Sequence, residues 1–262
     1  MRSNLYEHQR MAVEALENLQ SICGKHHLTL YLLAGTTLGA IRHQGMIPWD
    51  DDIDVGLTYK DWYKLREVLP KELNPKFEYI DYNIKKDFPR LFGKILYDRR
   101  NCVDVFLIAK WTSNPIWGNL HWQIRRMAQE CYKFSLNYAT PLRANLTEKQ
   151  QAHIKRVGFI RKIVYTIVKP FFDREDYIRL AKWNEKYYET HPSDCYVNLY
   201  SIYKMEKEMI RAEWIEHTSV VEFEGKQYTT VGDTDAYLTH LYGDYMTPPP
   251  INKRQAVHGE KF

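Results

Sequence analysis

The stretch LAGTTLGAIRHQGMIPWDDDIDVGL, residues 33–57, decides the fold of this chain. It ends in four carboxylates within five residues, namely Asp50, Asp51, Asp52 and Asp54. Each close pair of such charges repels by roughly 1 kcal/mol even in a water-like dielectric. This repulsion is tolerated only if the segment is well solvated or if a divalent cation neutralises it.

The residues around these carboxylates favour cation binding over simple solvation. Ile53, Val55 and Leu57 alternate with polar or small residues, which is the pattern of a half-buried strand. A period of two places Asp52 and Asp54 on one face of that strand, about 7 Å apart along the chain. We therefore expect these two carboxylates to bind a metal ion, with Mg²⁺ as the expected ion and Mn²⁺ as the alternative.

A glycine turn precedes the acidic strand. Residues 28–34 form a short apolar run with the length of a buried strand, followed by Gly35 and Thr36 and then by the spacing of a short helix. A strand–glycine–helix order leaves backbone N–H groups at the helix start, where an anion can bind. Taken alone, the same order is also typical of an ordinary tight turn.

A third acid stands in the apolar run CVDVFLI, residues 102–108. A lone buried carboxylate costs several kcal/mol unless it is paired or bound to a metal. A structural salt bridge would satisfy Asp104, but a meeting with Asp52 and Asp54 across a sheet explains it better. The sequence therefore predicts that Asp104 is the third acid of one site.

The remaining pattern predicts an α/β (α+β) fold, with a mixed sheet core and an additional mainly helical region. We see no repeats, linkers or low-complexity segments that would divide the chain. The expected helices are residues 4–26, a short helix after Gly35, residues 59–69 closed by Pro70, residues 115–138 and 147–190 with a turn at Thr140-Pro141, and residues 235–241; the expected strands are residues 28–34, 53–57, 77–80, 91–97 and 102–108, with a hairpin of residues 220–223 and 227–231.

Composition narrows the class of protein. The chain has 262 residues and a net charge of +4, which is too weak by itself to indicate nucleic-acid binding. Its four cysteines are scattered, which argues against a disulfide framework or a zinc ribbon and for reduced thiols in the cytoplasm. It has neither a signal peptide nor an apolar run long enough to span a bilayer. We expect a cytoplasmic protein, with a peripheral position at the inner face of the cell membrane as a second expectation.

The membrane expectation comes from one helical stretch. Residues 153–182 hold eight Lys or Arg against three acids, and residues 155–169 combine an apolar face with basic flanks. Such a helix can lie on an anionic membrane surface. The alternative is a helix that packs its apolar face into the core and leaves its basic side in water.

A glycine turn, an Asp-x-Asp strand and a third acid together suit attack on a phosphorus atom, in which positioning and charge neutralisation supply most of the rate. With these features the sequence resembles the LicD family, the phosphotransferase branch of the nucleotidyltransferase superfamily that includes fukutin and fukutin-related protein. AGTTLGAIRHQGMIPWDDDIDVG resembles the family signature, and VDVF around Asp104 and the C-terminal LYGDYMTPPPINKRQAVH resemble two further family patterns.

The resemblance implies transfer of phosphocholine, or of ribitol or glycerol phosphate, from a CDP-activated donor to a hydroxyl of a glycan or lipid-linked glycan. Teichoic acid, lipopolysaccharide and capsule repeats are acceptors of this kind. It also implies a single transferase domain over residues 1–262, with a nucleotidyltransferase-like core (1–112), a helical region (113–192) and a C-terminal part that completes the site (193–262). A true nucleotidyltransferase and a non-enzymatic metal- or nucleotide-binding scaffold are the alternatives.

The resemblance also assigns roles by motif position. Asp104 would be the catalytic base or a third metal ligand. The other assignments are Asp52 and Asp54 as catalytic metal ligands, Gly35 and Thr36 as the phosphate-contacting turn, Arg42 and His43 near the donor phosphates, Asp50 as a helper for metal or acceptor, and Lys94 as a further substrate-binding residue.

Overall fold

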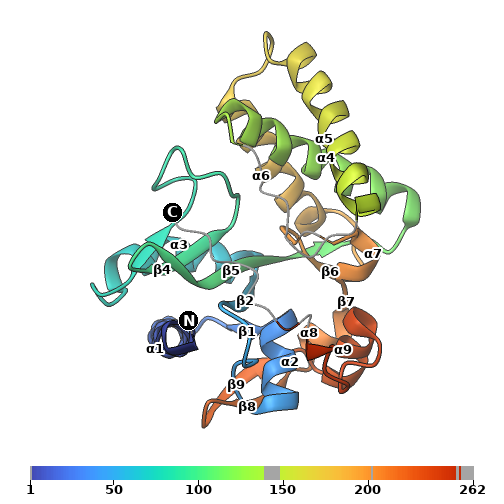
Figure 1. Ribbon diagram of the computed structural model, residues 1–262. Helices are drawn as coiled ribbons and strands as arrows, with labels where there is room; N and C mark the ends of the chain where they lie inside the picture. Colours follow the sequence, from blue (N-terminus) through green and yellow to red (C-terminus); the bar gives the residue numbers. More distant parts are fainter. Residues whose placement is uncertain (1, 139–147, 202, 252–253, 255–262) are drawn as a thin grey trace.

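A computed structural model describes residues 2–138, 148–201, 203–251 and 254. Within these residues one mixed sheet of nine strands forms the core, and helices pack around it (Figure 1). The strands are β1 (Tyr31–Leu32), β2 (Ile53–Thr58), β3 (Glu78–Ile80), β4 (Gly93–Tyr97), β5 (Arg100–Trp111), β6 (Cys195–Asn198), β7 (Met209–Arg211), β8 (Ser219–Phe223) and β9 (Lys226–Thr230).

The sheet follows the order β3-β4-β5-β2-β1-β9-β8, and β6 joins the end of β5 and carries β7. The pairs β2–β5 and β1–β9 are parallel and the other pairs are antiparallel. The mixed α/β fold predicted from the sequence is therefore confirmed. Strand β5 lies at the centre, and its residues 101–109 are all buried.

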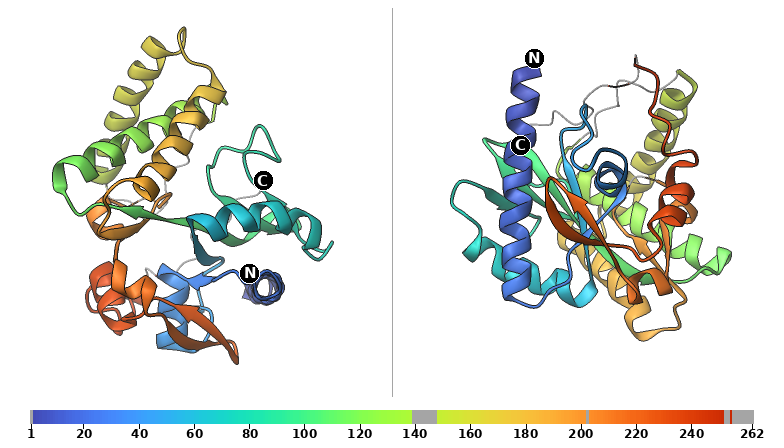
Figure 2. Two further views of the ribbon diagram at one scale, coloured as in Figure 1. Left: turned by 180° about the vertical axis from the view of Figure 1, so that it is seen from behind. Right: turned by 90° about the horizontal axis from the view of Figure 1, so that it is seen from below.

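Some helices of the described chain pack on the sheet, and others form a layer that extends away from it. Helices α1, α3 and α6 contact β5, whereas α2 contacts β2, β8 and α9. Helices α4, α5 and α6 pack on one another and extend away from the sheet (Figures 1 and 2). The bounds are α1 (Arg2–Lys25), α2 (Ala34–His43), α3 (Tyr59–Glu72), α4 (Pro115–Ser135), α5 (Glu148–Val168), α6 (Arg174–Thr190), α7 (Met205–Glu208), α8 (Ala212–Glu216) and α9 (Thr234–Tyr242).

Several expected boundaries were wrong. Pro70 does not close its helix, because α3 continues to Glu72 and the Leu73 N–H still donates to the Leu69 carbonyl at 3.0 Å. A proline in the last turn removes only one hydrogen bond, so the helix tolerates it. The expected strand 28–34 shortens to β1, and β5 is longer than expected.

The long helical stretch 147–190 is two helices. Helix α6 starts afresh because Asp173 and Asp176 form a capping box, in which each side chain accepts a hydrogen bond from the other residue's backbone N–H. The turn expected at Thr140-Pro141 lies outside the described residues. None of the described helices is long and apolar enough to cross a bilayer, and all four cysteines are buried free thiols.

Candidate active site

Three carboxylates meet where β2 and β5 run side by side. Asp54 and Asp104 are direct partners in the parallel register of these strands, and Asp52 lies just before β2. One oxygen from each of the three carboxylates lies within 4.8 Å of the others. The structure thus brings together the two alternating acids and the acid of the apolar run, as expected from the sequence.

The buried ammonium of Lys94 faces this group. Lys94 on β4 is the antiparallel partner of Asp104, and its Nζ lies 2.6 Å from Asp104 Oδ1. Burial raises the pKa of the Asp104 carboxyl, the charge of Asp52 raises it further, and Lys94 opposes both effects. The three carboxylates offer only oxygen ligands, which suit a hard divalent cation.

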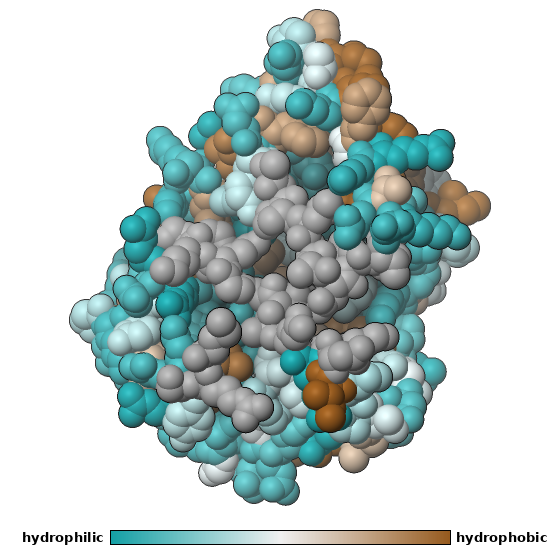
Figure 3. Space-filling view, viewed as in Figure 1, coloured by the Kyte–Doolittle hydropathy of each residue, from teal (hydrophilic) through white to brown (hydrophobic). Residues whose placement is uncertain are grey.

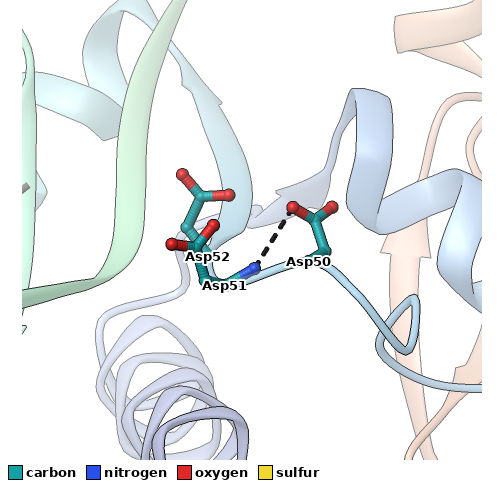
Figure 4. Close-up of side chains that lie close together, drawn as sticks. All are labelled: Asp50, Asp51 and Asp52. Atoms are coloured by element: carbon teal, nitrogen blue, oxygen red, sulfur yellow. Dashed lines mark hydrogen bonds between the residues drawn. The ribbon is translucent and has the colours of Figure 1, made fainter. Parts of the chain in front are cut away.

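Asp50 and Asp51 belong to the loop that leads into β2. The Asp51 N–H donates to Asp50 Oδ1 at 3.2 Å (Figure 4). One oxygen each of Asp50, Asp51 and Asp52 again lies within 4.8 Å, so a second group of carboxylates adjoins the first. In Figure 4 Asp50 lies on the α2 side of this loop, apart from the carboxylates of Asp51 and Asp52.

The first turn of α2 is fastened to the acidic strand. A Cβ on Gly35 would lie 3.4 Å from Asp50 Oδ2 and 3.9 Å from Asp54 Oδ2. Thr36 Oγ1 accepts a hydrogen bond of 2.7 Å from the Asp54 backbone N–H, so Thr36 positions Asp54. The helix begins before Gly35 rather than after it, since Ala34 already belongs to α2.

Ala34 itself carries backbone strain at this position. Its φ of 44° lies in the left-handed region, which is rare for a residue with a Cβ and costs on the order of 1 kcal/mol. Its N–H donates to the hydroxyl of Tyr237 on α9 at 3.1 Å. Contacts from α9 and β2 thus hold the start of α2 in place beside the carboxylates.

Arg42 and His43 lie at the other end of α2, roughly 10 Å from Gly35 at the helical rise. Arg42 Nη1 donates to the Tyr245 carbonyl at 2.6 Å. Burial, followed by the charge of Arg254, lowers the Arg42 pKa. The structure therefore separates these two residues from the Gly35–Thr36 turn and joins them to the C-terminal segment.

Arg254 and Trp49 complete this second, cationic group. The Arg254 guanidinium lies 5.0 Å from the centre of the Trp49 ring, and the His43 ring meets the same indole edge-on at 5.8 Å. Burial lowers the His43 pKa, and the charges of Arg42 and Arg254 lower it further. Sequence reasoning did not select Arg254, although it lies in the C-terminal stretch that resembles the family pattern.

Two side chains of α1 also escaped the sequence reasoning. His8 Nε2 donates to the carbonyls of Asp51 at 3.0 Å and Asn101 at 2.7 Å. Gln9 Nε2 donates to the carbonyl of Asp50 at 2.7 Å. These bonds fix the acidic loop to a helix that is more than forty residues away in the chain, and no local pattern indicates such contacts.

A cavity lies apart from these groups. A cavity of about 580 Å³ lies beside β7, α8 and α9, and its lining includes Ser113, Asp194, Trp214 and His240. None of the predicted site residues lines it. The carboxylates and the cationic group, rather than this cavity, therefore define the candidate site.

Comparison with known proteins shows which sequences this chain is similar to. Residues 27–149 match the model of the LicD/FKTN/FKRP nucleotidyltransferase domain. The chain is similar to the lipopolysaccharide cholinephosphotransferase LicD of Haemophilus influenzae, with 24% identity over 257 residues that cover 97% of this chain and 96% of the relative. An uncharacterized protein of Rickettsia prowazekii is 29% identical over 107 residues, which cover 41% of this chain and 36% of that protein.

Proposed function

Because this chain belongs to the LicD/FKTN/FKRP nucleotidyltransferase family, we propose that it transfers phosphocholine, or a related alcohol phosphate, from a CDP-activated donor to a glycan hydroxyl. Teichoic acid, lipopolysaccharide or a capsule repeat would carry that hydroxyl. The likeness to a lipopolysaccharide cholinephosphotransferase over nearly the whole chain supports phosphocholine first, and polyol phosphates second. The observation that carries the proposal is the meeting of Asp52, Asp54 and Asp104 on adjacent strands.

The donor set fits a hard divalent cation. Mg²⁺ and Mn²⁺ prefer oxygen ligands, and three carboxylates offer oxygens within 4.8 Å of one another. In this proposal Asp52 and Asp54 hold the ion, which when bound neutralises negative charge on the donor phosphates. Asp104 either completes the metal site or accepts the proton of the attacking hydroxyl, and the bond from Lys94 favours the ionised form that both roles require.

The remaining residues would position the donor. At the start of α2 the Gly35 N–H would meet a phosphate oxygen, and Thr36, whose own N–H already donates to the Leu33 carbonyl at 3.0 Å, would hold the turn in place. At the other end of α2, Arg42 and Arg254 supply positive charge, and the half-buried Trp49 ring beside Arg254 would add an aromatic contact for the base of the donor. Residues 1–112 would thus provide the chemistry, residues 113–192 a helical extension, and residues 193–262 the segment that closes the site.

In the proposed reaction the acceptor oxygen attacks the phosphorus that carries the alcohol. A P–O bond forms to the acceptor, the bond to CMP breaks, and the hydroxyl proton passes to Asp104. Asp50, beside the start of α2, is placed to assist the ion or the acceptor.

The test is release of CMP by the purified protein. Mixtures contain a glycan acceptor, CDP-choline, CDP-glycerol or CDP-ribitol, and either Mg²⁺, Mn²⁺ or a chelator. We expect release to need the ion, and Asp52→Asn with Asp54→Asn to lower the rate by about a thousandfold or more, because several kcal/mol of charge stabilisation are lost. Asp98→Asn, an exposed acid in the β4–β5 turn, is the matched control.

Two results would contradict the proposal. Equal CMP release by the parent and by the Asp52/Asp54 variant would exclude the metal mechanism. Pyrophosphate release from CTP, with no CMP from any CDP-alcohol, would indicate a true nucleotidyltransferase, and saturable Mg²⁺ binding without turnover would indicate a scaffold.

A further inference from the structure

Helix α5 differs from the other long helices in what it buries. The structure describes every side chain from residue 151 to residue 168, and none of them is buried. Four large apolar side chains of this helix are nearly half exposed or more: Phe159 (66%), Ile160 (50%), Ile163 (46%) and Ile167 (64%). A contiguous exposed apolar surface on a water-soluble fold marks a site of interaction.

The exposed apolar residues form one stripe on the outer face of the helix. Ile160, Ile163 and Ile167 follow the i, i+3, i+7 spacing that aligns side chains along a helix. Other residues form the inner face of the helix. Tyr165 and Val168 pack against the core, and the Tyr165 ring lies 5.6 Å from the Phe134 ring on α4. The stripe is therefore apolar surface left over after α5 has packed on the molecule.

The stripe continues past the end of the helix. Phe171 (79% exposed) and Phe172 (51% exposed) lie three and four residues after the last residue of α5. In Figure 3 hydrophobic residues gather at the upper edge of the molecule, where Figure 1 places α5. This region lies at the far end of the helical extension from the sheet (Figures 1 and 2).

The charges beside the stripe indicate the kind of partner. Lys155, Lys162 and Lys169 recur every seven residues, so they line up along one flank of the helix, and all three are exposed. Residues 149–172 contain no Asp or Glu at all. An apolar stripe flanked by basic and not by acidic side chains complements an acyl-chain boundary covered by anionic headgroups.

We propose that α5 and the Phe171-Phe172 segment lie in the surface of an anionic lipid bilayer. The outer apolar stripe enters the acyl boundary, and Lys155, Lys162 and Lys169 contact headgroup phosphates. The helix lies in the interface and does not cross the bilayer, in agreement with its composition. This inference is independent of the proposed reaction, because it uses no residue of the acidic centre or of the cationic group.

Vesicle co-sedimentation of the whole protein tests the proposal. We expect binding to vesicles with anionic phosphatidylglycerol, much weaker binding to phosphatidylcholine alone, and weakening by salt. Ile163→Gln with Ile167→Gln should lower the partition at least tenfold. Lys155→Glu with Lys162→Glu and Lys169→Glu should lower it more than a hundredfold, since each lysine contributes roughly fivefold at an anionic surface.

Matched controls exist on other elements. Val220→Gln replaces a side chain on β8 that is 62% exposed, and Lys60→Glu with Lys64→Glu and Lys71→Glu reverses three exposed lysines of α3. Both controls should sediment like the parent. Circular dichroism and thermal melting of each variant separate a loss of binding from a loss of folding.

A second measurement reports insertion rather than adhesion. Because the four native cysteines are buried, Ile163→Cys can be labelled with a polarity-sensitive thiol dye, and Val220→Cys serves as the control. On anionic vesicles the dye at residue 163 should shift to the blue and the dye at residue 220 should not.

Three outcomes would overturn the proposal: no sedimentation at low salt, equal loss of binding in the α5 and control variants, or no shift at residue 163. A dimer that dissociates on Ile163→Gln with Ile167→Gln, without vesicle binding by the parent, would assign the stripe to a second copy of the chain instead.

Discussion

The acidic centre and helix α5 depart from the usual distribution of side chains in opposite directions. At the centre, charged groups are buried, with Asp104 7% exposed and Lys94 5% exposed. On α5, apolar groups are exposed, with Ile167 64% exposed. Charged residues are almost never fully buried unless paired, and large apolar residues are usually inside.

The two departures affect the free energy of unfolding differently. A buried charge destabilises the folded state unless an opposite charge pairs with it. The acidic centre is therefore stable only while Asp104 and Lys94 remain paired. Exposing a stripe of isoleucines costs the folded state little, because these side chains are also in water when the chain unfolds. The acidic centre therefore reduces the free energy of unfolding unless its charges are paired. Helix α5 hardly affects that free energy, and its exposed surface is available to bind a lipid bilayer.

The largest effect on stability should come from removing the Lys94 ammonium from the acidic centre. Lys94→Met removes the ammonium that is bonded to the buried Asp104 carboxylate, so we expect the free energy of unfolding to fall by about 3–5 kcal/mol. Urea denaturation with a chelator present measures it. Lys64→Met, on an exposed lysine of α3, should change it by less than about 0.5 kcal/mol. If both variants match the parent, Asp104 is not ionised in the folded protein and the contrast with α5 disappears.

Glu208 tests whether burial of charge is costly elsewhere in the fold. Burial raises the pKa of its carboxyl to about 7, against an ordinary value of 4.5, although Ser201 Oγ donates a hydrogen bond to it. As pH rises from 4.5 to 7 the unfolded chain loses this proton first, so the free energy of unfolding should fall, by about 3 kcal/mol in all.

The stabilisation from this group is therefore complete below about pH 4.5 and lost above about pH 7. Glu208→Gln should remove this fall, which urea titrations at pH 5, 6, 7 and 8 would show. Parallel pH curves for parent and variant would mean that the folded protein already carries Glu208 ionised at pH 5.

A smaller effect should follow from loosening the cationic group beside the centre. Arg254→Ala removes the guanidinium over Trp49, and we expect the KM for the CDP donor to rise about tenfold with a smaller change in kcat. Arg211→Ala is the matched control, because Arg211 lies 5.2 Å from the ring of Trp214 and outside the site. An unchanged KM for Arg254→Ala would exclude the donor from this side of α2.

The smallest effect should be on α5 itself. Ile163→Gln with Ile167→Gln should change the free energy of unfolding by less than about 0.5 kcal/mol per substitution, because both side chains are largely exposed. Thermal or urea denaturation without lipid measures it. A loss of several kcal/mol would show that the stripe packs on the rest of the molecule and that the comparison with the acidic centre is mistaken.

The sequence predicted which acids meet at the centre better than it predicted the residues around them. Asp104 was predictable because a carboxylate in an apolar run needs a partner, and Asp52 and Asp54 because they alternate with apolar residues. The direct register of Asp54 with Asp104, and of Lys94 with Asp104, was not, since strand pairing depends on contacts between distant segments.

Other features were missed because the signal is not local. The bonds of His8 and the stacking of Arg254 on Trp49 join residues far apart in the chain. Helix α2 begins at Ala34, before the Gly35 turn from which the sequence predicted it to start. The Tyr237 hydroxyl on α9 accepts a hydrogen bond from the strained Ala34 at this position. The predicted end of α3 at Pro70 was wrong because packing, as well as helix propensity, decides where a helix ends.

The bonds from α1 have a practical consequence for anyone who handles this protein. A shortened chain that begins after Gln9 would retain each carboxylate and each cation of the site, and would look intact in a sequence alignment. It would nevertheless lose the donors that hold the Asp50 and Asp51 carbonyls. An inactive product of such trimming would reflect a loss of anchoring rather than a loss of catalytic groups.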